Sequence, residues 1–262
     1  MYIVGDVHAD LDRLKLLLNT NNLINHHDNW IGKQSKLFFV GDLVARGPYD
    51  LETIQFVREL QRQAYLDGGK INSCIGNHDA LFVSLVLGLE EHESYKAIDP
   101  AIRYHYYLNG GKESIIERAY ESFDDILWLS ERPMMIVEDG IAIQHADSIS
   151  YYKHLAYSMD KDDFVEAANE KGQELMSTHL GAWEVFGDMT DRRDWDYYGR
   201  STKEMQVYLD ILGAKHLVHG HSRHDFNYPV IYYDGLIANI DGSMSCGYRN
   251  DEDRGFIYCP EL

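Results

Sequence analysis

The sequence predicts a mixed α/β fold, because helical and strand-like patterns alternate in its first half and short strands follow in its last third. The apolar runs 36–40 and 70–75 read as buried strands, and a segment with helical periodicity precedes each of them. In the last third, short apolar runs are separated by glycine or acidic turns. A layered body of two sheets with helices outside fits this order, but periodicity alone leaves the number of sheets open.

The first half is expected to form a parallel sheet with helical crossovers. Apolar residues at helical spacing within 11–18 predict a first helix, with Asp10 as its N-cap. The same spacing within 51–60 predicts a second helix, capped by Asp50 and stopped by Gly68-Gly69. The resulting order of strand, helix, strand, helix and strand implies parallel strands joined by right-handed crossovers.

The second half is expected to contain helices, one hairpin and several short strands. Residues 90–131 read as mostly helical, with a turn at Asn109-Gly110-Gly111. Asp139-Gly140 stands between the apolar runs 133–138 and 141–144, which predicts a β-hairpin. The remaining elements are expected in this order: a helix at 158–182, a polar loop at 188–200, a helix at 202–212, and strands at 215–218, 230–233, 236–240 and 256–259.

Composition excludes several classes of protein. The formal net charge of −19 argues against non-specific nucleic-acid binding, and a phosphate site in so acidic a chain needs cations placed locally. Three widely spaced cysteines make no disulfide framework, and the start of the chain has no secretory signal. No apolar run approaches the length of a membrane span. We therefore expect a cytoplasmic protein with no membrane partner, and no linker-like segment divides its single domain, residues 1–262.

Polar side chains follow the predicted strands at their carboxyl ends, several of them after a glycine. Because open α/β sheets bind their ligands beyond the carboxyl ends of the strands, we expect these side chains to meet. All of them are oxygen or nitrogen ligands, with no cysteine among them, which suits Mn²⁺, Fe or Zn²⁺. The six candidates are Asp6, His8, Asp42, Asn77, His145 and His221.

Asp42 is predicted to bridge two metal ions. A carboxylate shared in this way holds two ions roughly 3.5–4 Å apart, as in two-metal phosphatases. Water bound between the two ions would have a lowered pKa, and the hydroxide that it forms could attack phosphorus. Arg46 would stabilise the negative charge on the phosphoryl oxygens. Taken singly, each residue has a plainer explanation: a turn aspartate, a core histidine such as His145, or an arginine in a surface ion pair. The metal site rests on the joint pattern.

The motifs GDVH, GDLVARG, GNHD, HAD and HGHS together resemble the phosphoprotein phosphatase (PPP) type of calcineurin-like metallophosphoesterase. The family patterns are GD-x-HG, GD-x-VDRG and GNHE, followed by later histidines. The segments Leu108–Gly111 and Ile240-Asp241-Gly242 also resemble small members of this family. The resemblance covers nearly the whole chain and implies a two-sheet β-sandwich flanked by helices, two divalent metal ions, and a phosphoric monoester hydrolase.

The resemblance also implies a role for each motif residue. His78 would be the general acid, and Arg46 would grip the phosphate together with Asn77. A second family arginine lies between the two late histidines, where Arg192 is the best match and Arg193 its neighbour. The first metal would be held by Asp6, His8 and Asp42, and the second by Asp42, Asn77, His145 and His221.

Two departures from the family pattern bear on these roles. Ala45 stands where the family has an aspartate that orients the catalytic histidine. Three explanations are open: another acid such as Asp79 takes over this role, the enzyme acts slowly on poor leaving groups, or its substrate has a leaving group that needs little protonation. Asp79 itself replaces the glutamate of GNHE, with a small expected effect. At His219-Gly220-His221 the PPP pattern selects His221, and Arg223 stands where broader metallophosphoesterases have another histidine ligand.

Three functions remain open from the sequence. The first is a phosphatase acting on phosphoprotein, with Ser/Thr and also Tyr side chains as candidate substrates, or on a phosphorylated small molecule. The second is a dinucleoside-tetraphosphate hydrolase, whose good leaving groups would make Ala45 less harmful. The third is a metal-holding pseudo-enzyme that captures phosphorylated partners. The oligomeric state is not predicted.

Overall fold

The computed structural model describes residues 1–156, 163–190, 201–248 and 254–260. Its strands form two sheets, with the orders β3-β2-β1-β9 and β4-β5-β6-β8-β7. The strands are β1 (Tyr2–Val4), β2 (Lys36–Phe39), β3 (Lys70–Ser73), β4 (Met135–Glu138), β5 (Ile141–Gln144), β6 (His216–His219), β7 (Val230–Tyr232), β8 (Ile237–Asn239) and β9 (Ile257–Tyr258).

The predicted parallel order of the first three strands is confirmed. β1 pairs with β2 in parallel, with Ile3 opposite Phe38, and β2 pairs with β3 in parallel, with Phe38 opposite Asn72. β9 adds to β1 in the antiparallel direction, so a strand from near the end of the chain completes the first sheet. In the second sheet β4 and β5 form the predicted hairpin, and β5, β6 and β8 run parallel to one another.

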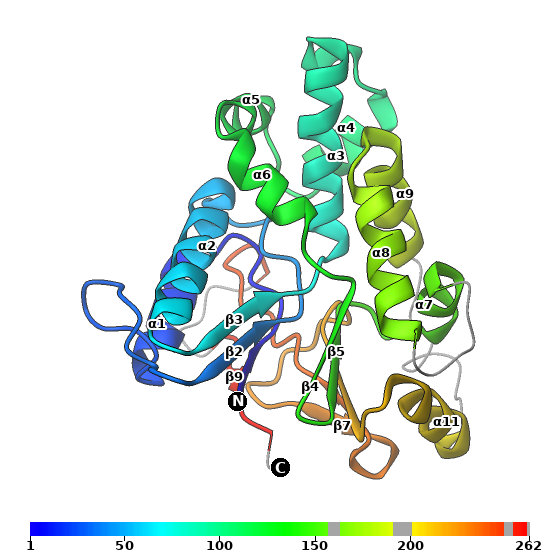
Figure 1. Cartoon of the computed structure of the whole chain (residues 1–262). Coiled ribbons are helices and arrows are strands. Elements are labelled where there is room, and N and C mark those ends of the chain that lie inside the picture. The colour runs from blue at the N-terminus through cyan, green and yellow to red at the C-terminus, as the bar shows by residue number, and fades with distance from the viewer. Residues whose placement is uncertain (157–162, 191–200, 249–253, 261–262) are drawn as a thin grey trace.

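Helices lie to the left of, above and to the right of the strands in Figure 1. The α1 and α2 helices lie beside the first sheet, while α3, α4, α8 and α9 stand above the strands in this view. The α-helices are α1 (Leu11–Thr20), α2 (Asp50–Leu66), α3 (Asn77–His92), α4 (Pro100–Leu108), α5 (Glu113–Glu121), α6 (Phe123–Ser130), α7 (Ile149–Ala156), α8 (Phe164–Met176), α9 (His179–Thr190) and α11 (Thr202–Leu212). Short 3₁₀ helices occur at Tyr95–Ala97 and Tyr233–Gly235.

The space between the two sheets is filled by a compact set of apolar side chains. Ile3 and Phe38 come from the first sheet, and Ile143, Val218 and Ala238 come from the second, and all five belong to one buried cluster. The Cys74 thiol donates to the Ile143 carbonyl across this layer at 3.3 Å. The two sheets therefore pack face to face as the predicted sandwich, and this fixes the ends of their strands relative to one another.

Two predicted helix boundaries are wrong. The expected single helix over 158–182 is interrupted, since α8 ends at Met176 and a separate α9 begins at His179 and continues into the predicted loop as far as Thr190. The expected cap Asp50 is instead the first helical residue of α2, and its carboxylate accepts from the Ala45 amide. No glycine or proline occurs at the α8–α9 junction, so no breaker marks it in the sequence.

Among the described residues, no helix is both long enough and apolar enough to cross a membrane.

Candidate metal centre

The carboxyl ends of five strands bring the six predicted ligands to one place. Asp6 follows β1, Asp42 follows β2, and Asn77 opens α3 beyond β3. His145 directly follows β5, and His221 follows β6, so the second sheet supplies two further nitrogen ligands. All are buried except His221, which is partly exposed. Parallel strands end at the same edge of their sheet, which explains why residues so distant in sequence become neighbours.

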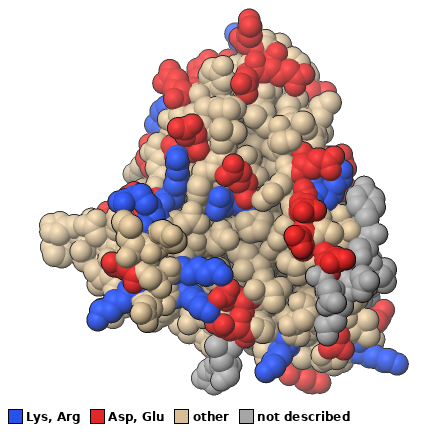
Figure 2. Space-filling model, in the orientation of Figure 1, with Lys and Arg blue, Asp and Glu red and all other residues tan. Residues whose placement is uncertain are grey.

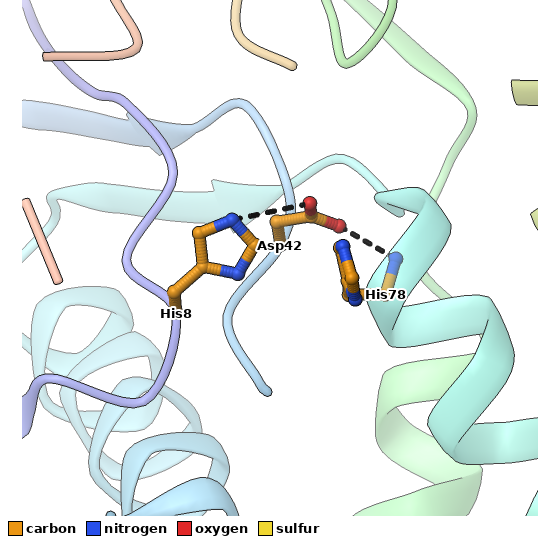
Figure 3. Close-up of side chains that lie close together, drawn as sticks. All are labelled: His8, Asp42 and His78. Carbon is orange, nitrogen blue, oxygen red and sulfur yellow. Dashed lines mark hydrogen bonds and ion pairs between the residues drawn. The ribbon is translucent and has the colours of Figure 1, made fainter. Parts of the chain in front are cut away.

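The Asp42 carboxylate lies between His8 and His78 (Figure 3). Its Oδ2 lies 3.6 Å from His8 Nε2 and 3.4 Å from His145 Nε2, while its Oδ1 accepts from the His78 backbone amide at 2.8 Å. The carboxylate therefore stands between a histidine of the first sheet's loops and one from the second sheet. This is the position that the sequence analysis predicts for a bridging ligand.

A second set of atoms converges beside Asp42. Asn77 Oδ1 lies 3.0 Å from His145 Nε2 and 3.1 Å from His221 Nδ1. The Asn77 amide nitrogen donates to Thr190 Oγ1 at 3.0 Å, so the amide oxygen is the atom turned toward the histidines. Asp6, on the other side, accepts from the His221 backbone amide at 3.1 Å and lies 3.9 Å from His8 Nε2.

Glycines permit this close approach of loops. A Cβ on Gly76 would lie 2.1 Å from Asp42 Oδ1, and a Cβ on Gly220 would lie 2.0 Å from Asp6 Oδ1. Both distances are far below van der Waals contact, so any side chain at either position would displace a carboxylate. The glycines that precede Asn77 and His221 in the motifs are therefore explained by lack of room.

The orientation of His8 directs one ring nitrogen toward the carboxylates. His8 Nδ1 donates to the Val44 carbonyl at 3.1 Å, which fixes the tautomer and directs the lone pair of Nε2 toward Asp42 and Asp6. Hydrogen bonding of the other ring nitrogen in this way is typical of metal-ligating histidines. Burial lowers the pKa of His8 to about 4, so the ring is neutral at physiological pH.

The pKa values of Asp6 and Asp42 are shifted in opposite directions. Burial, followed by the neighbouring Asp241 and Asp42, raises the pKa of Asp6. Burial also acts to raise the pKa of Asp42, but His145 and His78 outweigh it and lower that pKa well below its ordinary range. Buried carboxylates packed together in this way are costly without cations to neutralise them.

The donor set fits two divalent cations. Two triads share Asp42, and within each the possible ligand atoms lie within 4.8 Å of one another: His8, Asp42 and His78 in one, and Asp6, Asp42 and His145 in the other. The atoms are carboxylate oxygens and imidazole nitrogens, with an amide oxygen from Asn77 alongside. Such donors suit hard to borderline ions, and sharing of one carboxylate suits two ions at once.

His78 lacks the acidic partner that the family pattern provides. Arg46 donates to His78 Nε2 at 3.2 Å, so the proton of the neutral ring is on Nδ1. Nδ1 is buried and has no hydrogen-bond partner among the described residues. Asp79 does not replace the missing aspartate, because its carboxylate accepts from the backbone amides of Gly76 and Leu43. Asp50 is likewise bonded to the Ala45 amide.

All of the predicted ligands except His145 line a cavity of about 220 Å³, whose wall also contains residues absent from the sequence prediction. Thr190, Arg223 and Tyr248 complete its wall beside Arg46 and His78. Arg223 follows His221 by two residues, and that spacing could have indicated it as a cavity residue. Tyr248 had no comparable signal. The predicted Arg192 and its neighbour Arg193 lie outside the described residues.

Comparison with known proteins defines the class to which this fold and site belong. The profile of the calcineurin-like phosphoesterases matches residues 1–224, and the chain belongs to this family. The chain is 33% identical over 253 residues to Shewanella-like protein phosphatase 1 of Plasmodium berghei, covering 92% of this chain and 66% of the relative. It is 30% identical over 145 residues to a symmetrical bis(5'-nucleosyl)-tetraphosphatase of Vibrio parahaemolyticus, covering 55% of this chain and 43% of the relative.

A solved structure shares the fold. A crystal structure of a cold-active protein-tyrosine phosphatase from a psychrophilic Shewanella species superposes with a TM-score of 0.67 at 20% identity, covering 94% of this chain and 72% of that one. The relatives and this shared fold agree with the PPP type that the motifs resemble. The chain spans less than two thirds of the length of both curated relatives.

Proposed function

We propose that this protein is a metal-dependent phosphatase that hydrolyses phosphomonoesters of phosphoproteins. The observation that carries the proposal is Asp42, whose carboxylate lies 3.6 Å from His8 and 3.4 Å from His145 with Arg46 in the same cavity. Family membership supports the phosphoesterase chemistry, and the protein phosphatase name of the Plasmodium relative supports the substrate class.

In this proposal the chain's own residues divide the work. Asp6, His8, Asp42, Asn77, His145 and His221 hold two divalent ions, with Mn²⁺ first and Fe or Zn²⁺ as alternatives. Two such ions, when bound, neutralise phosphoryl charge and lower the pKa of bound water. Arg46 holds the phosphoryl oxygens with its planar set of donors, and Asn77 helps to position them. His78 donates a proton to the leaving oxygen.

The state of His78 favours a particular kind of leaving group. Its Nδ1 has no acceptor among the described residues, so nothing there stabilises the protonated ring or fixes its orientation. Leaving groups that need little protonation should therefore react best. Among phosphoproteins this favours phosphotyrosine, since a phenol is a better leaving group than an alkyl hydroxyl, over phosphoserine and phosphothreonine.

A second candidate follows from the same observation. Nucleotide leaving groups need little protonation, and the Vibrio relative is named for hydrolysis of dinucleoside tetraphosphates. A base would need a stacking surface near the cavity. Tyr106, Tyr151 and Tyr152 are fully buried in the core and cannot stack on a ligand, whereas Tyr107 is exposed. Tyr248 lines the cavity, but Arg46 and Arg223 already lie against its ring. The match to the Plasmodium relative covers 92% of this chain and the match to the Vibrio relative 55%, which favours the phosphoprotein substrate.

The experiment is to measure turnover of p-nitrophenyl phosphate by protein stripped with a chelator and then reloaded with Mn²⁺, Fe²⁺ or Zn²⁺. Reloading should restore activity. Parallel assays on phosphotyrosine and phosphoserine peptides and on diadenosine tetraphosphate then assign the substrate class. Faster turnover of the dinucleotide would favour the second candidate. Absence of turnover with every metal would reject both and favour a phosphate-binding pseudo-enzyme.

A further inference from the structure

Two arginines of the cavity share one aromatic ring. The guanidinium carbon of Arg46 lies 4.7 Å from the centroid of the Tyr248 ring, and that of Arg223 lies 4.9 Å from the same centroid. Both arginines line the cavity beside Asp42 and His8. Cations within about 6 Å of an aromatic centroid are attracted to its face, so Tyr248 holds two positive groups beside the candidate metal site.

No carboxylate of the described residues neutralises these two cations. Figure 2 shows several separate groups of Asp and Glu side chains on the face that it draws, and the formal net charge of the chain is −19. Elsewhere, Arg58 is paired with Asp125 and Arg254 with Asp10. Neither Arg46 nor Arg223 forms an ion pair with a carboxylate of any described residue, and so their charge is available to an anion in the cavity.

The loop that carries Tyr248 is attached firmly to the site. Ser245 Oγ donates to the His8 carbonyl at 3.0 Å, and the Cys246 amide donates to Asp10 Oδ2 at 2.8 Å. The Tyr248 ring also contacts the His8 ring edge to face, with centroids 5.3 Å apart. The ring is therefore a fixed support for both arginines.

We propose that Arg223 is a phosphate-binding residue, which contacts the phosphoryl oxygens together with Arg46 while Tyr248 positions both guanidiniums. This rests on the proposed phosphatase function and adds a specificity-determining residue to it. Arginine suits the task because its planar donors match two phosphate oxygens at once. The spacing supports the same assignment, since Arg223 occupies the turn just after His221 and lines the cavity.

The test measures phosphate binding apart from turnover. Protein loaded with Mn²⁺ is titrated with inorganic phosphate by calorimetry, and the inhibition constant of phosphate and KM for p-nitrophenyl phosphate are measured in parallel. Arg223→Ala should weaken phosphate binding and raise KM by about 10- to 100-fold. Metal content should be unchanged. Arg223→Lys, which keeps the charge but not the fork of donors, should fall between wild type and Arg223→Ala.

Control variants distinguish phosphate binding by Arg223 from the general effect of removing an arginine that packs on an aromatic ring. Arg103 lies 5.8 Å from the Tyr95 ring and is not among the residues that line the cavity, so Arg103→Ala removes a similar contact and should leave phosphate affinity unchanged. Tyr248→Leu should weaken phosphate binding by removing the ring, and Tyr248→Phe should retain it. Unchanged phosphate affinity in Arg223→Ala overturns the proposal. If wild type binds phosphate without turnover, the proposed function fails while the role of Arg223 is still measured.

Discussion

The two oxygens of Asp42 have different tasks. Oδ1 accepts from the His78 backbone amide, while Oδ2 faces the ring nitrogens of His8 and His145. The other buried carboxylates of the site have fewer ring partners: Asp6 has one at 3.9 Å, and Asp79 is bonded to the backbone. The geometry therefore supports the proposed bridging role of Asp42 and agrees with the motif.

Asp42→Asn tests that role. The substitution keeps an oxygen for the His78 amide but loses the negative charge between the two histidines. Metal content measured by mass spectrometry should fall below two ions per chain, and turnover should fall at least about 100-fold. Asp139→Asn is the control, because asparagine suits a hairpin turn before glycine as well as aspartate does. Full activity of Asp42→Asn would exclude a bridging carboxylate.

Substitution of Ala45 tests whether the missing aspartate limits His78 as a general acid. The φ of 68° at Ala45 lies in the left-handed region, which aspartate tolerates better than alanine, so Ala45→Asp should fold well. The new carboxylate should accept from His78 Nδ1 and raise kcat on phosphoserine peptides about tenfold, with little change on p-nitrophenyl phosphate. Ala45→Asn, which lacks the charge, is the control. An equal change on both substrates, or none, would contradict the account of His78.

At the scale of the element, the strand ends determine the site and the glycines determine how closely they meet. Apolar runs and capping residues predict β1 to β3, the β4–β5 hairpin and α1, because each depends on a local pattern. The α8–α9 break has no glycine or proline to mark it, and its one local signal is Thr178, whose Oγ1 accepts from the Gly181 amide at 3.1 Å in the first turn of α9. The contact between Arg223 and Tyr248 has no local signal for a related reason: it joins two separate loops through an aromatic face. The sequence marks only the position of Arg223, two residues after His221.

Gly76→Ala tests the close approach at the start of α3. The methyl group would meet Asp42 Oδ1 at 2.1 Å, so the carboxylate must move away from His8 and His145. Metal affinity should fall at least about tenfold, and turnover should fall with it. Gly187→Ala in α9 is the matched control, since nothing lies within 4 Å of its added Cβ. That variant should keep its activity and gain about 0.5–1 kcal/mol in stability. Retention of tight metal binding by Gly76→Ala would show that Asp42 is not held against this backbone.

At the scale of the whole molecule, acidic groups in the interior make stability depend on pH. Burial raises the pKa of Asp50 to about 6, against an ordinary value of 3.8, even though its carboxylate accepts from the Ala45 amide. The folded state thus holds this proton more tightly than the unfolded chain does. Asp50 opens α2 and is not one of the predicted ligands, so its titration can be followed with metal present in excess.

The sign of the effect follows from proton binding. Between the unfolded and folded pKa values the native protein carries more protons at Asp50, so the free energy of unfolding falls as pH rises through this window. From about pH 4.5 to about pH 7 the loss is roughly 2 kcal/mol, since one pKa unit corresponds to about 1.4 kcal/mol. Asp50→Asn keeps an oxygen for the Ala45 amide and removes the titration.

Urea unfolding at the two pH values, at one fixed metal concentration, measures the difference. The stability of Asp50→Asn relative to wild type should therefore increase by about 2 kcal/mol between the lower and the higher pH. Other buried acids, such as Asp6 and Asp79, titrate equally in wild type and in Asp50→Asn, so their contributions to the pH dependence cancel in the difference between the two proteins. Asp124→Asn, in the first turn of α6, is the control and should follow wild type. A constant difference between Asp50→Asn and wild type would mean that Asp50 is ionised in the folded protein throughout this range, with the Ala45 amide and Arg118 outweighing burial.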